Sequence, residues 1–266
     1  MASDRITSVF QKAGQKPVMA MFITAGYPEP AVTPDIIAAL ESSGADIIEL
    51  GMPFSDPLAD GPTIQYSSEV AIEQGTDLDS IFEMVKQVRI TSSIPIVLMG
   101  YINPILYYGV EKFFEKAASA GVDGFILPDV PVEEAGLVET YCDKHALALI
   151  YLVAPNTTDE RMRLIDQKSH GFVYCVSVTG VTGARDGDQV AQSVSRFIDR
   201  VKANITKNPV LVGFGIKSHE DAKQISAGLR GFVVGSALID TIRKNYPNSD
   251  WLDRTREFVE EIKYGK

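Results

Sequence analysis

The chain has 266 residues, of which 45% are hydrophobic and 23% are charged, and its formal net charge is −10. This length and composition allow a large buried core, whereas the negative charge disfavours binding to nucleic acid or to an anionic membrane. The N-terminal stretch MASDRITSVFQKAGQK lacks the apolar segment of a secretory signal, and no apolar run is long enough to span a bilayer. Two distant cysteines, Cys142 and Cys175, indicate neither a disulfide framework nor a zinc site, so we expect a cytoplasmic protein.

Short apolar runs rich in β-branched residues recur along the chain and alternate with helical patterns. The expected strands are Val18–Thr24, Asp46–Leu50, Ile96–Met99, Gly124–Leu127, Leu147–Val153, Phe172–Ser177, Val210–Gly213 and Gly231–Val234. The expected helices include Asp4–Ala13, Val110–Ala120, Glu133–His145, Asp159–Lys168, Gln189–Asn204, Glu220–Ala227 and Trp251–Tyr264. This alternation is typical of βαβ units and a parallel sheet, and the uniformly apolar strands indicate burial of both faces.

Eight strand–helix repeats favour a closed barrel over an open sheet, and a barrel of this type needs about 250 residues. We therefore predict an α/β fold, a (β/α)8 TIM barrel. No linker or change of composition divides residues 1–266, so one domain is expected. The helix at Asp4–Ala13 precedes the first strand and should cover the bottom of the barrel, whereas the last helix should pack outside.

Glu49 is an acid among apolar residues at the end of the second expected strand, the end at which TIM barrels carry their chemistry. Burial would raise its pKa and let it exchange protons near neutral pH. The alternative is a structural acid that caps a backbone N–H or pairs with a lysine.

Asp60 follows in a loop with three prolines and two glycines between Gly51 and Pro62. Proline restricts the backbone, so this loop has few available shapes. Asp60 is therefore a second catalytic candidate, although it could equally be the N-cap of a helix that starts near Thr63.

Glycine-rich turns follow the last three strands: V-T-G-A, G-F-G-I and V-G-S-A. In barrels of this kind, bare backbone amides and a short helix N-terminus at this place bind phosphate. Tight turns without a ligand remain the alternative. The three histidines lack partners at metal-ligand spacing, so no metal site is expected, and strands two to six carry no lysine for a Schiff base.

The stretch I-E-L-G-M-P-F-S-D-P-L-A-D-G-P-T-I-Q closely resembles the signature of the tryptophan synthase alpha chain family. Further similar segments follow in order along almost the full length: F-I-T-A-G-Y-P, L-M-G-Y-I-N-P, L-P-D-V-P-V-E-E, V-T-G-V-T-G-A-R, G-F-G-I and V-V-G-S-A. The resemblance implies a lyase that splits indole-3-glycerol phosphate into indole and glyceraldehyde 3-phosphate by a retro-aldol reaction in tryptophan biosynthesis. It also implies that Glu49 is the acid and base and that Asp60 binds the indole N–H.

The resemblance assigns further residues to the substrate and to a partner. Substrate-binding positions would be Phe22, Ile64, Met99, Tyr101, Leu127, Tyr174, Thr182, Gly183, Gly213, Phe214, Gly215, Gly235 and Ser236. Interface positions would be Pro53, Asp56, Pro57, Asn103, Asp129 and Pro131. The partner would be a beta chain in an α2β2 heterotetramer, and pyridoxal phosphate would be bound by the beta chain, with no cofactor in this chain. Simple packing is the alternative for the aliphatic positions, and an exposed rim loop for the interface.

Two other functions stay open at this point. One is another phosphosugar-handling barrel, such as an isomerase that uses the same loops, and the other is a non-catalytic barrel that activates a partner. The pair of carboxylates beside phosphate loops favours catalysis.

Overall fold

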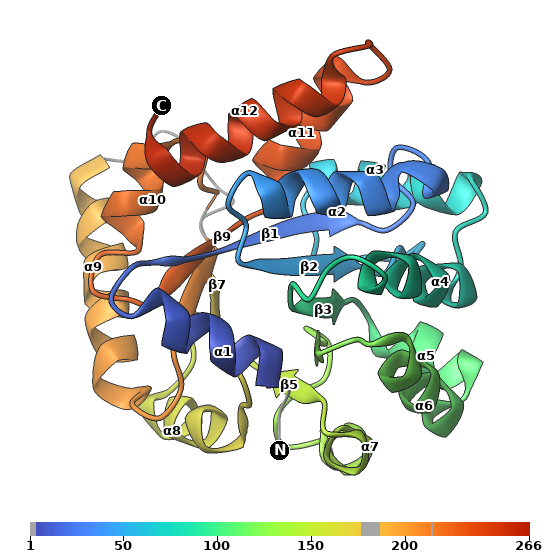
Figure 1. Cartoon of the computed structure of the whole chain (residues 1–266). Helices are drawn as coiled ribbons and strands as arrows, with labels where there is room; N and C mark the ends of the chain where they lie inside the picture. The colour runs from blue at the N-terminus through green and yellow to red at the C-terminus, as the bar shows by residue number, and fades with distance from the viewer. Residues whose placement is uncertain (1–3, 177–186, 214) are drawn as a thin grey trace.

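The computed structural model describes residues 4–176, 187–213 and 215–266, which form a parallel sheet ringed by helices (Figure 1). Its strands are β1 (Val18–Thr24), β2 (Ile47–Gly51), β3 (Ile96–Met99), β4 (Gly124–Ile126), β5 (Ala148–Ile150), β6 (Leu152–Val153), β7 (Val173–Val176), β8 (Val210–Gly213) and β9 (Gly231–Val234). Their order is β5-β4-β3-β2-β1-β9-β8-β7-β6. The predicted TIM barrel is confirmed.

The barrel closes within one predicted strand, Leu147–Val153, which the structure divides into β5 and β6 at Tyr151. β5 pairs with β4 and β6 pairs with β7, so this segment joins the two ends of the sheet. The Tyr151 carbonyl accepts a hydrogen bond from the Tyr174 amide at 3.0 Å, which keeps the backbone paired across the division.

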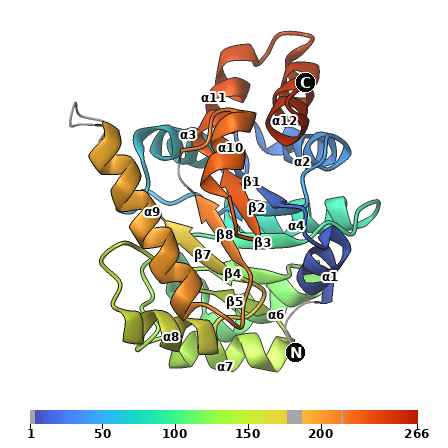
Figure 2. The same cartoon turned by 90° about the vertical axis from the view of Figure 1, so that its left-hand side faces the viewer.

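One or two helices separate successive strands along the chain, except between β5 and β6, and they surround the sheet (Figures 1 and 2). They are α1 (Asp4–Ala13), α2 (Thr33–Ser42), α3 (Pro62–Glu73), α4 (Leu78–Arg89), α5 (Ile102–Tyr108), α6 (Val110–Ala120), α7 (Gly136–His145), α8 (Asp159–Lys168), α9 (Gly187–Asn204), α10 (His219–Ile225), α11 (Ser236–Asn245) and α12 (Trp251–Tyr264). Polar side chains cap several of them: Asp77 accepts from the Ser80 amide at 2.8 Å at the start of α4. Helix α7 begins later than predicted, because a turn in which the Glu134 amide bonds the Pro131 carbonyl precedes it.

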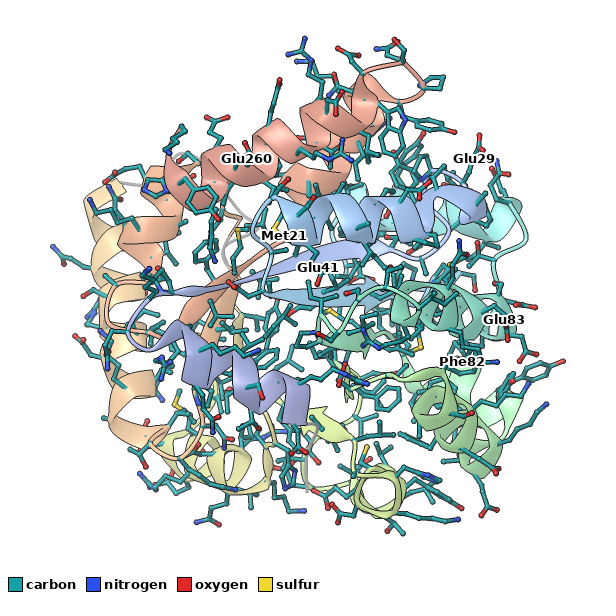
Figure 3. The ribbon with its side chains drawn as sticks, viewed as in Figure 1. Met21, Glu29, Glu41, Phe82, Glu83 and Glu260 are labelled. Carbon is teal, nitrogen blue, oxygen red and sulfur yellow. The ribbon has the colours of Figure 1, made fainter. Side chains whose placement is uncertain are left out.

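Two apolar layers hold the barrel. Alternate strand residues such as Ala20 and Val97 form an interior cluster, which Ile6 and Phe10 of α1 join at the bottom. Helix α1 therefore covers the bottom of the barrel, as predicted. Their neighbours in sequence, such as Met21, point outward into a larger layer between the sheet and the surrounding helices (Figure 3).

One buried carboxylate with two arginine partners stabilises this lower end. Asp123, fully buried just before β4, accepts from Arg5 of α1 and from Arg89 at the end of α4, each at 2.8 Å. It also accepts from the Ile96 amide at 2.9 Å. Because a buried carboxylate needs such partners, Asp123 ties α1, α4 and β3 to one point.

Candidate active site

Glu49 lies near the upper end of β2 and faces the barrel interior. Ile47, two residues earlier, belongs to the interior cluster, whereas Leu50 belongs to the outer layer. In the sheet register Glu49 stands between Phe22 on β1 and Val97 on β3. Because side chains alternate along a strand, the carboxyl group points into the barrel, at the upper end of the interior cluster.

The Glu49 carboxyl is fully buried, and neither oxygen has a hydrogen-bond partner among the described residues. Burial raises its pKa from 4.5 to about 8, because the charged form loses its hydration. At neutral pH the group is therefore mostly protonated and still able to release its proton. The alternative of a capping or lysine-paired acid finds no support in the described part of the chain.

Asp60 is held in the loop between β2 and α3 by several contacts. Its amide donates to the Pro57 carbonyl at 3.0 Å, and its own carbonyl accepts from the Gln65 side chain at 2.9 Å. The N-cap of α3 is Gly61, so the alternative in which Asp60 is the N-cap is wrong.

Tyr101, at the start of α5, lies beside Asp60. Its hydroxyl accepts from the Ala59 amide at 2.9 Å and bonds the Asp60 carboxylate. Burial raises the pKa of Asp60, and the bond from Tyr101 lowers it in part. Sequence reasoning missed Gln65 as a second support of this loop; its place one turn into the helix that follows Asp60 is the signal that could have found it.

Tyr174 of β7 is influenced by the charges of both carboxylates. Its ring is buried among the interior residues, and burial raises its pKa well above 10, followed by the negative charge of Glu49 and then, more weakly, that of Asp60. Both acids therefore lie within electrostatic range of the same phenol. The structure brings Glu49 and Asp60 to one end of the barrel, as the sequence predicted.

The predicted pocket residues fall into two groups. Phe22, Met99 and Tyr174 belong to the interior side, and Phe22 lies so close to Gly51 that a Cβ there would meet its ring at 2.6 Å. Leu127 belongs to the outer apolar layer, and Ile64 packs against that layer. For these last two residues, packing remains a sufficient explanation.

The predicted phosphate loops lie beside Tyr174 and Phe22. A Cβ on Gly213 would meet the Tyr174 hydroxyl at 2.5 Å, and one on Gly235 would lie 3.4 Å from Phe22. Gly215 has a φ of +56°, which favours glycine. Helix α11 begins at Ser236, and among the described residues no side chain caps its N-terminus. Thr182, Gly183 and Phe214 lie outside the described residues.

The predicted interface residues gather on the same rim. Asp129 accepts from the Ile102 amide at 3.0 and 3.2 Å, which joins the loop after β4 to the start of α5 and leaves Asn103 exposed beside it. Phe54 packs on Tyr101 with ring centres 5.3 Å apart. Pro53, Asp56, Pro57 and Pro131 complete this set, of which Asp56 is exposed and the prolines are partly buried.

Comparison with known proteins identifies the family. The family model described as tryptophan synthase alpha chain matches residues 10–265.

The chain belongs to the tryptophan synthase alpha chain family.

Relatives with this name include that of Thermoanaerobacter sp. (strain X514), which is 44% identical over 98% of this chain and 97% of its own length. That of Geobacter sulfurreducens is 49% identical over 88% of this chain and 89% of its own length. The crystal structure of tryptophan synthase subunit alpha from Legionella pneumophila str. Paris superimposes with a TM-score of 0.88, at 38% identity, over 99% of this chain and 97% of that one.

Membership of the tryptophan synthase alpha chain family makes the chain an alpha subunit of tryptophan biosynthesis and an enzyme of the lyase type. Among the described helices, none combines the length and apolarity needed to cross a membrane.

Proposed function

We propose that this chain cleaves indole-3-glycerol phosphate to indole and glyceraldehyde 3-phosphate, with Glu49 as the acid and base. The observation that carries the proposal is the buried, unpartnered Glu49 carboxyl with a pKa of about 8, within electrostatic range of the same phenol as Asp60. A pKa near the working pH suits a group that must both give and take a proton.

The reaction needs one proton donated to the substrate and one proton removed from it. Protonated Glu49 delivers its proton to carbon 3 of the indole ring, and the ring becomes cationic. The bond from carbon 3 to the side chain then breaks, and its electron pair returns to the ring to give indole. The side-chain hydroxyl loses its proton to the Glu49 carboxylate and becomes the aldehyde, so Glu49 ends as it began.

Asp60 stabilises the cationic ring by accepting a hydrogen bond from the indole N–H. A fixed carboxylate opposite a developing positive charge lowers the barrier without having to reorganise. Tyr101 supports this role, because its hydrogen bond lowers the pKa of Asp60 and favours the ionised form.

The phosphate group would be bound by the turns after β8 and β9, at Gly213, Gly215, Gly235 and Ser236. The start of α11 offers backbone amides and the positive end of a helix dipole. A chain of net charge −10 needs such a local site to hold an anion.

Alpha-chain membership implies a beta chain as partner. We propose an α2β2 assembly in the cytoplasm, with pyridoxal phosphate on the beta chain and no metal or cofactor on this one. The rim that carries Pro53, Asn103 and Asp129 would face the beta chain, and exposed Leu58 and Tyr107 add apolar surface to it.

The test is to incubate the purified chain with indole-3-glycerol phosphate and measure released indole, with and without a beta chain. Glu49→Gln should lower kcat by more than about a hundredfold, the scale of general acid–base catalysis, with KM nearly unchanged. Near-normal turnover of this variant would remove Glu49 from the mechanism. Added beta chain should raise the rate, and a flat titration would argue against the partner.

A further inference from the structure

Two side-chain pairs join helices α3 and α11, which lie side by side (Figures 1 and 2). The Thr63 hydroxyl donates to Asp240 at 3.3 Å, and the Arg243 guanidinium lies 4.0 Å from the centre of the Tyr66 ring. Thr63 and Tyr66 are three residues apart on α3, as Asp240 and Arg243 are on α11. Residues at this spacing share a helix face, so the pairs form two successive rungs, which we call the α3–α11 ladder.

The α3 side of the ladder is anchored to the barrel. Tyr66 packs edge-on against buried Tyr27, with ring centres 6.2 Å apart and an angle of 74° between the rings. The next residue, Ser67, is buried and shares a 2.6 Å hydrogen bond with Thr24 at the end of β1. Movement of α11 relative to α3 would therefore also be movement relative to the mouth of the barrel.

Each helix starts at one end of the proposed substrate site. Helix α3 follows directly after Asp60 and Gly61, and its Gln65 side chain holds the Asp60 carbonyl. Helix α11 begins at Ser236, and Asp240 lies one turn further along. The ladder thus connects the residue proposed for the indole N–H to the amides proposed for the phosphate.

We propose that the α3–α11 ladder positions these two ends and sets the length of substrate that the site accepts. Its four residues are positioning residues, because their proposed role does not require contact with the reacting atoms of the substrate. The selected feature is the number of carbon atoms between the indole ring and the phosphate. This inference rests on the proposed function, because it needs indole at Asp60 and phosphate at α11.

The ladder is suited to adjust geometry without dominating stability. Exposed cation–π contacts and surface hydrogen bonds contribute little to folding. Small displacements at an active site can nevertheless have large effects on binding and rate. Loss of the ladder should leave the fold intact and act on ligands that bridge both ends.

The experiment uses three indol-3-yl-alkyl phosphates with linkers of two, three and four methylene groups, with dissociation constants measured by calorimetry. The wild-type chain should prefer one length by about tenfold or more. In the double variant Asp240→Ala/Arg243→Ala, affinity for that ligand should fall about three- to tenfold, the scale of two such contacts. The preference for this linker length over the other two should fall to about threefold. The affinities of the double variant for inorganic phosphate alone and for indole alone should stay within about twofold of the wild-type values.

Two control variants accompany the double variant. Tyr66→Phe keeps the aromatic ring under Arg243 and should keep the wild-type length preference. Lys244→Ala removes an exposed cation from the same turn of α11, one that lines the hollow between α11 and α12 instead, and should also behave as wild type. If the double variant fails to fold, Thr63→Val removes the donor at constant shape and should still narrow the preference, though less.

A ladder variant that keeps the full length preference would overturn the proposal. Equal losses for phosphate alone and for the bridging ligands would also overturn it, because they indicate local damage to the phosphate site. A wild-type chain that neither binds these ligands nor cleaves indole-3-glycerol phosphate would refute the proposed function instead, so the two failures can be told apart.

Discussion

The substitution Glu49→Gln keeps the shape of the side chain and removes its ionisation, so it isolates the cost of burying this carboxyl. The folded state holds the pKa of Glu49 at about 8, against 4.5 for a free glutamate. Between these two pH values the folded chain carries a proton that the unfolded chain has lost. The free energy of unfolding of the wild-type chain therefore falls as the pH rises through this window.

The size of the effect follows from the shift. Each pH unit inside the window costs about 1.4 kcal/mol of stability. From pH 5 to pH 7 the wild-type chain should lose ~2.5 kcal/mol relative to the glutamine variant. At pH 5 the two should be close in stability, because a neutral carboxyl and an amide are similar in shape and polarity.

The assay is urea-induced unfolding of both chains at several pH values from 5 to 8. Other titrating groups are common to both chains and cancel in the difference. Glu260→Gln on the exposed face of α12 is the control, and its difference from wild type should stay constant across the series (Figure 3). A Glu49→Gln difference that does not change with pH would refute the argument that desolvation sets the state of this carboxyl.

Three further predictions concern other parts of the molecule. Asp123→Asn should lower the free energy of unfolding by about 3–5 kcal/mol, because it removes the charge of a fully buried carboxylate that two arginines contact. The control Asp253→Asn, in an exposed pair, should change it by less than about 1 kcal/mol in the same urea titration. Ser236→Asp should raise KM for the phosphate substrate more than about tenfold, because the added carboxylate repels the phosphate. The melting temperature should be unchanged or higher, since an acidic residue at the start of a helix is stabilising. An unchanged KM would show that the phosphate binds elsewhere. Tyr101→Phe should raise the pKa of Asp60, so the acidic limb of the kcat/KM profile should move to higher pH, and a limb that stays in place would contradict the role of this bond.

Sequence reasoning predicted the strands well where burial on both faces leaves a uniform apolar pattern. The bounds of β1, β3, β8 and β9 agree with those expected, because each is a short apolar run between turn residues. The division of Leu147–Val153 at Tyr151 was not predicted, because it depends on which strands pair on either side of the closure.

The site was predictable where a residue type conflicted with its position. A glutamate in a buried strand marked Glu49, and the structure adds that its oxygens lack partners among the described residues. Contacts between distant segments left no such mark. Examples are the close approach of Gly213 to Tyr174 and the Asp123 ion pair, which joins residues more than a hundred positions apart.

The closure of the barrel at Tyr151 restricts how a partner can attach. Every described strand except β5 and β6 lies between two others, and β5 and β6 are parts of one segment that pairs with β4 on one side and with β7 on the other. The closed sheet therefore leaves little free edge that a visiting polypeptide could extend through its main chain. In the proposed assembly, a beta chain would instead bind side chains of the loops that follow the strands. Sequence changes in those loops can then alter which partner the chain binds, while the barrel keeps its fold.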